Sequence, residues 1–484
     1  MLFKNTNTIC VSYKIPGTCI KKYFHTSAIL SSRSSKITYS LPRIIGNILP
    51  RIIKGKGIYL YTEDGRKILD TSSGAAVACI GYGNNRVINA MKKALDTGTP
   101  YLSTSFWGNN VVELLCEEMI NGTKGQMAKV YLCGSGSEAI EATLKLSRQF
   151  FFDQDPETLR VNFIARENSY HGVTIGALSI SGHIERRAPY LPLLMKNVHH
   201  VSSCNPYRQR IEGESDAAFV TRKAAELDAK FRELGPETVI GFIAEPVVGA
   251  ALGCVPHVPG YLKAMRDVCH KYGALFILDE IMCGMGRTGT LHAWQAVDVV
   301  PDIQTIAKGL GGGYQPIGAV LISEKVFNVL QKRGRFVHAQ TYQSMPIQAA
   351  AALEVQKIIR EGNLMDNVSK LGEYLGVRLK AVLGNHPNVG DIRGQGLFWG
   401  IEFVKDNLTK EPFDRKLDIA ENIKNTALLP PYNMTVYAGT GTADGVRGDH
   451  IMLAPPYILK KKDVDHIVMV ISAVIKDVFK KINS

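Results

Sequence analysis

The alternation of apolar and polar positions predicts a β-hairpin ahead of the main body of the chain. From Ile58 to Asp70, apolar and polar side chains alternate around the pair Asp64-Gly65. Such alternation is typical of strands with one buried face, and an Asp-Gly pair is typical of a tight hairpin turn. We therefore expect two antiparallel strands joined at Asp64-Gly65.

A longer α/β pattern follows this hairpin. Short, almost wholly apolar runs alternate with stretches of helical periodicity, and they cover residues 129–132, 162–165, 239–244, 274–278 and 319–322. Runs of this kind are typical of parallel strands that are buried on both faces of a sheet. The block from about residue 90 to residue 340 is therefore expected to form one parallel sheet covered by helices on both faces.

The pattern changes again after residue 341. An alanine-rich helix is predicted over residues 346–361, a strand near 398–404 and a final helix over 462–482. We therefore expect a smaller α+β domain formed from both ends of the chain. The predicted organisation is a leader (1–36), the first part of the small domain (37–90), a large domain (91–340) and the rest of the small domain (341–484).

Composition places the chain among ordinary globular proteins. Its 484 residues are 45% hydrophobic and 21% charged, and a chain of this length exceeds one typical hydrophobic core. No run of about 18 apolar residues occurs, so no membrane-spanning helix is expected. The nine cysteines form no Cys-x-x-Cys pair, so neither a disulfide framework nor a zinc site is indicated.

The charge is unevenly distributed along the chain. The formal net charge is +13, but no Asp or Glu precedes Glu63, so much of the excess lies in the N-terminal segment and binding to nucleic acid is not expected. Residues 1–36 combine scattered Lys and Arg with many Ser and Thr, a composition typical of a mitochondrial transit peptide. We expect import into the mitochondrial matrix, and a basic tail without a targeting role is the alternative.

Candidate chemistry lies where apolar runs end. Asp279 follows the run 275–278, at the edge where open α/β sheets bind ligands. Lys308 precedes a glycine cluster, 309–313, that allows close approach of the backbone to a ligand. The turn 134–137 leads from a strand into a helix, where free N–H groups would bind a phosphate, although the lysine of a nucleotide P-loop is missing.

Each of these features has a simple structural explanation when it is taken alone. An Asp that ends a strand is often a cap, an exposed Lys is usually solvated, and Gly-Ser turns are common. Together they supply a carboxylate, an amine and an anion cradle, which are the groups that a phosphorylated pyridine aldehyde requires. The amine forms a Schiff base with the aldehyde, and the carboxylate keeps the pyridine nitrogen protonated.

From about Tyr59 to its C-terminus, the sequence resembles the class III aminotransferases of the type I pyridoxal-phosphate fold. The resemblance rests on five motifs in the order that the family has them: 134–139, 169–172, 244–246, 278–289 and 307–313. It implies a large, doubly covered, mostly parallel sheet, a smaller α+β domain and pyridoxal 5'-phosphate as the cofactor. It also implies a transaminase that uses a small-molecule amino donor and a keto acid acceptor.

The resemblance also implies roles for single residues in the cofactor site. Lys308 is expected to be the Schiff-base lysine and proton shuttle, and Asp279 the partner of the pyridine nitrogen. Further cofactor contacts are expected from Gly136 and Ser137 at the phosphate, Tyr170 and His171 in one motif, Ile281 on the opposite ring face, Glu245 near the ring substituents, and Thr341. A core role for Tyr170, a helix cap for Thr341 and a structural role for Glu245 are the alternatives.

Thr341 lies in a segment that, in the family, reaches the phosphate of the neighbouring subunit, so a homodimer with a shared active site is implied. For the substrate, the resemblance points to Arg447 as a mobile cation for a keto acid, with a surface cation as the alternative. Met452 stands where relatives that hold an α-carboxylate often have Arg. Tyr82, Tyr101, Phe106 and Trp107 are candidate pocket residues, of which Phe106 and Trp107 are preferred, although any of the four could be core.

The expected reaction transfers an amino group from an amine, an ω-amino acid or an amino acid to pyruvate or 2-oxoglutarate, in two half-reactions. Aminomutases and decarboxylases of the same fold share every cofactor residue named above, so they stay open as alternatives, as does a scaffold protein without catalysis. A nucleotide-binding oxidoreductase is disfavoured because no Gly-x-Gly-x-x-Gly motif opens a helix with an acid about twenty residues later.

Overall fold

The computed structural model describes residues 8–15, 18–25, 39–46 and 49–483. Much of the predicted leader, residues 1–36, lies outside the described residues. Within that segment, β1 (Thr8–Ile15) and β2 (Thr18–His25) pair as an antiparallel hairpin. The chain divides into two compact units, Met1–Ile52 and Ile53–Ser484, and the second unit carries the candidate site.

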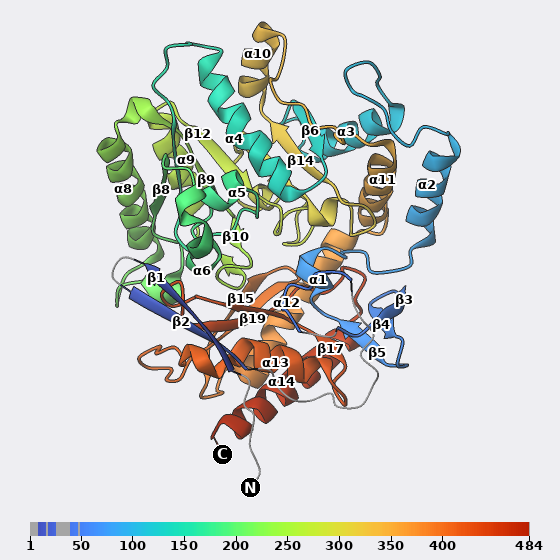
Figure 1. The fold of residues 1–484 in the computed structure, drawn as a ribbon, viewed down its shortest axis with the longest axis vertical. Coiled ribbons are helices and arrows are strands. Elements are labelled where there is room, and N and C mark those ends of the chain that lie inside the picture. The colour runs from blue at the N-terminus through green and yellow to red at the C-terminus, as the bar shows by residue number, and fades with distance from the viewer. Residues whose placement is uncertain (1–7, 16–17, 26–38, 47–48, 484) are drawn as a thin grey trace. The chain divides into compact units, whose positions relative to one another are not determined.

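A seven-stranded sheet with the order β6-β14-β13-β12-β9-β7-β8 forms the centre of the second unit (Figure 1). Its strands β9, β12, β13 and β14 are buried along their whole length, as a sheet covered on both faces requires. In chain order the strands are β6 (Lys129–Cys133), β7 (Asn162–Arg166), β8 (Val198–Val201), β9 (Val239–Ala244), β12 (Leu275–Asp279), β13 (Ile303–Ile306) and β14 (Gly318–Ile322).

All five apolar runs are strands of this sheet, but the expectation that 319–322 runs parallel to the others is wrong. The strand at that position, β14, is antiparallel to both of its neighbours, β13 and β6, while the other six strands share one direction. The connection from β13 to β14 holds only a 3-10 turn, η4 (Lys308–Leu310), in place of a crossover helix. Without a crossover helix the chain returns antiparallel.

Helices cover both faces of the sheet, as the alternation within β12 shows. Leu275 and Ile277 pack in one apolar cluster with helices α4, α5 and α10, whereas Phe276 and Leu278 pack in another with α8 and α9. A third cluster joins α3 and α11 to the sheet. These helices are α3 (Asn110–Gly122), α4 (Gly136–Phe152), α5 (Ile175–Ile180), α8 (Asp216–Leu234), α9 (Tyr261–Lys271), α10 (Glu324–Arg333) and α11 (Pro346–Glu361).

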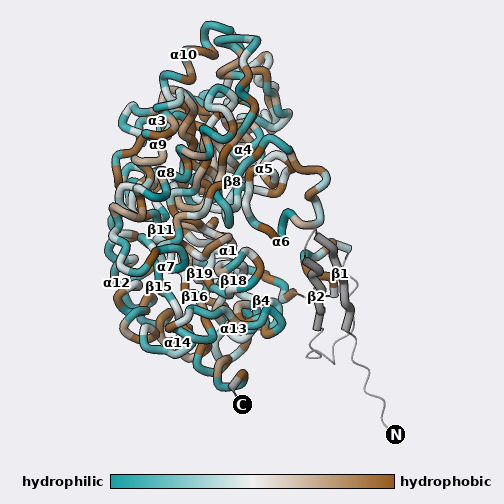
Figure 2. The backbone as a smooth tube through the Cα atoms, turned by 90° about the vertical axis from the view of Figure 1, so that its left-hand side faces the viewer, coloured by the Kyte–Doolittle hydropathy of each residue, from teal (hydrophilic) through white to brown (hydrophobic). Residues whose placement is uncertain are grey.

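Two four-stranded sheets complete the unit. The first has the order β15-β16-β19-β18, and it lies with α12, α13 and α14 (Figure 2). The second has the order β17-β5-β4-β3, so residues near the start of the unit share a sheet with residues 434–435. The strands are β3 (Ile52–Lys56), β4 (Tyr59–Thr62), β5 (Lys67–Asp70), β15 (Val389–Gln395), β16 (Phe398–Phe403), β17 (Met434–Thr435), β18 (Tyr437–Thr440) and β19 (Asp449–Leu453).

The predicted hairpin is confirmed as the antiparallel pair β4 and β5, and Gly65 in its turn has a φ of +85°. The two predicted long helices are α11 and α14. The remaining elements are α1 (Ser73–Ala76), α2 (Asn85–Asp96), α6 (Ile184–Arg187), α7 (Pro206–Gln209), β10 (Val247–Val248), β11 (Val255–Pro256), α12 (Leu364–Leu383), α13 (Ile419–Leu428) and α14 (Lys461–Asn483). Within the described residues, no helix is both long and apolar enough to cross a bilayer.

Helix α12 packs directly on the turn between β15 and β16, which gives a test of the fold. A Cβ added to Gly372 would lie 2.1 Å from the carbonyl oxygen of Gly396. We expect Gly372→Ala to lower the free energy of unfolding by about 1–3 kcal/mol. This loss outweighs the gain of roughly 1 kcal/mol by which Ala is favoured over Gly in a helix. Chemical denaturation of the cofactor-loaded protein measures the change.

The control for this substitution is Val377→Ala, because the Val377 side chain on the same helix is 61% exposed. It should change the free energy of unfolding by less than about 0.5 kcal/mol. A Gly372→Ala protein as stable as the wild type would contradict the close packing of α12 on this turn.

Candidate active site

The predicted site residues gather at one edge of the seven-stranded sheet. Because β6, β7, β9, β12 and β13 run in the same direction, the segments that follow them meet at the carboxyl edge, where sheets of this kind bind ligands. Each of these strands contributes to the site: Gly136 and Ser137 after β6, Tyr170 and His171 after β7, Glu245 after β9, Asp279 at the end of β12 and Lys308 after β13.

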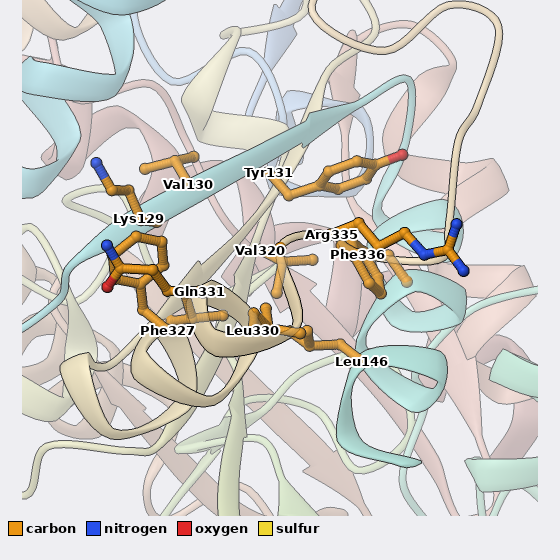
Figure 3. A pocket seen from close by; sticks show the side chains of 13 residues that line it. Lys129, Val130, Tyr131, Leu146, Val320, Phe327, Leu330, Gln331, Arg335 and Phe336 are labelled. Carbon is orange, nitrogen blue, oxygen red and sulfur yellow. The ribbon is translucent and has the colours of Figure 1, made fainter. Parts of the chain in front are cut away.

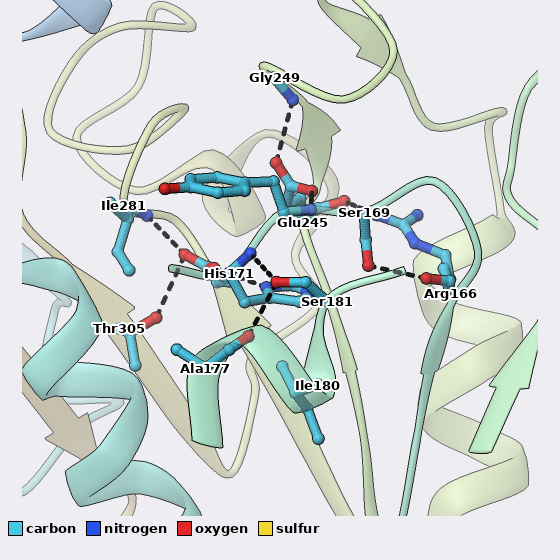
Figure 4. A network of polar contacts seen from close by, with 12 residues as sticks. Arg166, Ser169, His171, Ala177, Ile180, Ser181, Glu245, Gly249, Ile281 and Thr305 are labelled. Carbon is cyan, nitrogen blue, oxygen red and sulfur yellow. Dashed lines mark hydrogen bonds and ion pairs between the residues drawn. The ribbon is translucent and has the colours of Figure 1, made fainter. Parts of the chain in front are cut away.

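The carboxylate of Asp279 is buried and belongs to a polar network. Its partners His171, Ile281 and Thr305 are labelled in Figure 4. Its Oδ2 lies 2.7 Å from Nδ1 of His171. Its Oδ1 accepts hydrogen bonds from the Ile281 N–H at 3.0 Å and from the Thr305 hydroxyl at 3.3 Å. The backbone N–H of His171 donates in turn to Oγ of Ser181 at 2.8 Å. These contacts therefore fix the orientation of the Asp279 carboxylate.

Glu245 uses both of its carboxylate oxygens to fix nearby backbone. Oε1 accepts from the Tyr170 N–H at 3.1 Å, and Oε2 accepts from the Gly249 N–H at 3.0 Å. Burial raises the pKa of Glu245, while the neighbouring His171 opposes that shift. The acid therefore positions Tyr170 and the turn at Gly249.

The start of α4 supplies the predicted anion cradle. Ser135 caps the helix by accepting from the Glu138 N–H at 3.2 Å. In the described part of the chain, no hydrogen bond uses the N–H groups of Gly136 and Ser137, which leaves them for an anion at the helix N-terminus. A Cβ on Gly136 would lie 3.0 Å from the Ile281 side chain, so glycine lets Ile281 lie close to this cradle.

Lys308 lies in a strained backbone segment that contacts elsewhere in the chain hold in place. Its φ of +43° is in the left-handed region, which costs roughly 1–2 kcal/mol for a residue with a side chain. The amide of Gln356 donates to the carbonyl oxygens of Gly309 at 3.1 Å and Leu310 at 2.8 Å. These bonds fix the turn that carries Lys308.

The amine of Lys308 is free to react. It has no hydrogen bond or ion pair with another described residue. Burial lowers the pKa of Lys308, although the charges of Tyr437 and Asp279 oppose this shift. A lowered pKa increases the share of neutral, nucleophilic amine near neutral pH.

Two residues near this site were not identified from the sequence. Tyr437 on β18 lies close enough to Lys308 to affect its pKa, and it packs in one apolar cluster with Tyr170 and Met452. The guanidinium of Arg186 on α6 lies 4.3 Å from the centre of the Tyr170 ring. Neither residue belongs to a recognisable motif, because each reaches the site through the packing of distant segments.

Three of the predicted residues are exposed on this single chain. The side chains of Phe106 and Trp107 are 77% and 65% exposed, and Thr341 lies in an exposed turn. The role of Thr341 at a neighbouring subunit's phosphate and the roles of Phe106 and Trp107 in the substrate pocket stay predictions.

The other two predicted substrate residues contact neighbours within the chain. Arg447 is exposed and pairs with Asp444 in its own loop at 2.7 Å. The hydroxyl of Tyr82 donates to Asp70, and its ring lies against Gly55. Both contacts fix the two side chains locally, and their roles toward a substrate stay predictions.

A cavity of about 370 Å³ between β6, α4 and α10 is separate from this site (Figure 3). Its walls are largely apolar and include Tyr131, Val320, Leu330 and Phe336. None of the predicted site residues lines it. Within the described residues there is also no group of three or more His, Cys, Asp or Glu side chains placed to hold a metal ion.

Comparison with known proteins assigns the family. The family described as "Aminotransferase class-III" matches residues 42–475. An aminotransferase of Gibberella zeae is 50% identical over 420 residues, which are 86% of this chain and 82% of that protein. A vanillin aminotransferase of Capsicum chinense is 34% identical over 438 residues, which are 89% and 92% of the two chains. The chain therefore belongs to the class III aminotransferases.

A solved structure agrees with this assignment. The ω-transaminase of Pseudomonas jessenii in complex with PMP aligns with a TM-score of 0.83 and 31% identity, over 90% of this chain and 94% of that one. The predicted class of fold, the transaminase activity and the dependence on pyridoxal phosphate are thus confirmed.

The residues of the site fit pyridoxal phosphate. The N–H groups at the start of α4 suit its phosphate, the buried Asp279 suits a protonated pyridine nitrogen, and the unpaired amine of Lys308 suits its aldehyde. When bound, the cofactor supplies a carbonyl that condenses with amines and a ring that accepts electrons.

The chain itself supplies charge, orientation and a proton carrier. Asp279 provides the negative charge at the ring nitrogen, and His171 keeps its carboxylate in place. The Lys308 amine could take a proton from the substrate carbon that bears the amino group and deliver it to the carbon that was the cofactor's aldehyde. Burial of Asp279 and Glu245 excludes water, which strengthens these electrostatic effects.

The role of Asp279 is testable by Asp279→Asn. The change removes the negative charge but keeps the shape, so cofactor absorbance should persist while kcat falls by at least about 100-fold. Single-turnover kinetics with an amine donor measures this loss. An Asp279→Asn enzyme with the kcat of the wild type would contradict the assigned role.

Glu280→Gln is the matched control, because Glu280 is the adjacent buried carboxylate. Its oxygens accept from the Ala293 N–H at 2.6 Å and the Trp294 N–H at 2.9 Å, away from the site. The control should lose stability but keep most of its turnover.

Proposed function

We propose that this aminotransferase takes an amino group from an amine or an ω-amino acid and passes it to a keto acid such as pyruvate or 2-oxoglutarate. The observation that carries the proposal is the apolar character of the wall at Met452. That residue is buried on β19, is paired with Tyr437 of β18, and precedes the Ala454-Pro455-Pro456 segment.

A charged side chain of a donor placed against this wall would lack a partner, and an unpaired charge in an apolar environment is costly. The cluster around Met452 is apolar and includes Met282, Phe398 and Tyr170. It suits the carbon skeleton of an amine or of a substrate whose carboxylate lies far from the reacting carbon. Two of the similar proteins are named as an ω-transaminase and a vanillin aminotransferase, and these names support the same class of donor.

We also propose that the enzyme is a homodimer with shared active sites, in which Thr341 reaches the phosphate of the partner's cofactor. Thr341 lies next to two exposed aromatic side chains, since the rings of Tyr342 and Tyr101 are exposed and their centres lie 6.2 Å apart. Exposed aromatic side chains of this density usually mark an interface. Phe106 and Trp107, which follow Tyr101 in the chain, would then line the pocket together with residues of the second subunit.

For localisation we propose the mitochondrial matrix. The support is the composition of residues 1–36, in which basic residues occur among Ser and Thr without any acid.

The donor is identified by a spectroscopic half-reaction. The visible absorbance of the cofactor-loaded wild type should bleach on addition of an aromatic amine or β-alanine, and it should return when pyruvate or 2-oxoglutarate is added. Ornithine and glutamate should bleach it more slowly, because the apolar cluster around Met452 offers no partner to their charged side chains. Faster bleaching by glutamate than by every amine tested would overturn the proposed donor class.

Product analysis of the same reaction separates transamination from the alternatives. An aminomutase would leave an isomer of the donor, and a decarboxylase would release carbon dioxide, whereas transamination yields the keto or aldehyde form of the donor.

The dimer is tested by the double substitution Phe106→Glu with Trp107→Glu. Four carboxylate oxygens in place of two exposed rings should shift the sedimentation coefficient from dimer to monomer, and activity should fall with it. Leu408→Glu is the control, since Leu408 is 93% exposed in a distant loop. A doubly substituted protein that sediments as the wild type would overturn the assignment of this surface.

A further inference from the structure

The carboxylate of Glu138 folds back over the start of its own helix, α4. Its Oε2 accepts a hydrogen bond from the Gly134 N–H at 2.7 Å, while the Glu138 N–H donates to Oγ of Ser135 at 3.2 Å. These contacts form a variant of the capping box, in which the acid binds the residue just before the helix cap. Glu138 therefore fixes the path of the chain into the phosphate cradle at Gly136 and Ser137.

The same carboxylate oxygen also binds a distant segment of the chain. Nε2 of Gln340 donates to Oε2 of Glu138 at 3.3 Å. Residues 340–343 form a turn, because the Gln343 N–H donates to the Gln340 carbonyl oxygen at 3.1 Å. Thr341 lies inside this turn, directly after Gln340. Glu138 therefore joins the start of α4 to the turn that carries Thr341.

A second set of contacts holds the other end of this turn against β6. Oε1 of Gln343 accepts hydrogen bonds from the Tyr131 hydroxyl at 2.9 Å and from the Gln340 N–H at 3.1 Å. Tyr131 belongs to β6, the strand that leads into the phosphate cradle. The 340–343 turn is thus bound to both the strand and the helix that form the cradle, and Thr341 lies between the two attachments.

The charge of Glu138 does not explain why it lies beside the cradle. A carboxylate repels a phosphate, so by charge alone Glu138 weakens the binding of the cofactor. Among the described residues no Lys or Arg forms an ion pair with it, so this repulsion is not cancelled locally. The two hydrogen bonds of its side chain, to the Gly134 N–H and to the Gln340 amide, both fix the geometry of neighbouring segments. Its role therefore follows from the segments that it joins.

We propose that Glu138 is a positioning residue for the phosphate of the cofactor. Its carboxylate oxygen aligns the loop before α4 with the 340–343 turn, so that one group places both the phosphate cradle and Thr341. In the proposed homodimer, this arrangement couples the cradle of one subunit to the turn that serves its partner, and this consequence rests on the proposed homodimer.

The test compares the binding of pyridoxal phosphate with that of pyridoxal, which lacks the phosphate, to the full-length protein freed of cofactor. For Glu138→Ala, the Kd for pyridoxal phosphate should be at least about 10-fold weaker than for the wild type, the loss expected for a hydrogen bond to a charged group. The Kd for pyridoxal should change by less than about twofold, because that ligand does not use the cradle. Titration of the visible absorbance measures both constants.

Glu138→Gln separates the hydrogen bonds from the charge. The amide oxygen of Gln can accept the same two bonds, so the Kd for pyridoxal phosphate should stay within about threefold of the wild type. Glu141→Ala is the matched control on the same helix, since Oε1 of Glu141 accepts from the Gly176 N–H at 2.8 Å and the Ala177 N–H at 3.2 Å, at the start of α5. The control should leave the ratio of the two Kd values unchanged.

A double-mutant cycle tests the link to the turn. Gln340→Ala alone should weaken the binding of pyridoxal phosphate by about 2–10-fold, because it removes one hydrogen bond to Glu138. In the Glu138→Ala background the same substitution should add less than about a twofold loss, because its partner is already missing. Additive losses in this cycle would overturn the link between the cradle and the turn.

Two further outcomes would overturn the proposal. Equal losses for pyridoxal phosphate and pyridoxal in Glu138→Ala would indicate a general structural effect. Tighter binding of pyridoxal phosphate by both Glu138 variants would show that charge repulsion outweighs positioning. The proposed homodimer fails separately, if the wild type sediments as a monomer, and the comparison of the two ligands still decides the role of Glu138 in that case.

Discussion

The active site depends on the contacts that compensate the burial of the Asp279 carboxylate, which is only 3% exposed. A buried charge without partners is strongly destabilising. The ring of His171, the Ile281 N–H and the Thr305 hydroxyl supply the compensating contacts. These partners come from segments at the ends of β7, β12 and β13, so the charge requires that particular order of parallel strands.

The two sides of the site have different physical character. On the cofactor side, Asp279, Glu245 and the start of α4 are fixed by hydrogen bonds, which gives a rigid polar surface. On the substrate side, Met452 and its neighbours form an apolar wall. Lys308 lies between them on a turn that packing holds in a left-handed conformation. This contrast is the basis on which we propose an amine or an ω-amino acid as the donor.

The sequence predicted the strands that are continuous apolar runs, and the motif residues at their ends. It missed β8 and β13 because polar pairs interrupt them, His199-His200 in one and Gln304-Thr305 in the other. It gave the wrong direction for β14, since direction depends on the connection and not on the strand's own residues. Tyr437 and Arg186 were not predicted from the sequence, because only the packing of the folded chain brings them near the site. Thr341, Phe106 and Trp107 are exposed on the single chain, and their roles stay predictions.

The central claim is that the chain holds its cofactor through the amine of Lys308 at this sheet edge. Reduction of the cofactor-loaded enzyme with borohydride makes such a linkage permanent, and peptide mass spectrometry then locates it. The predicted result is one pyridoxyl phosphate group per chain, on the peptide that contains Lys308. Attachment to a different lysine, or no attachment in a protein that shows the cofactor's visible absorbance, would contradict the account.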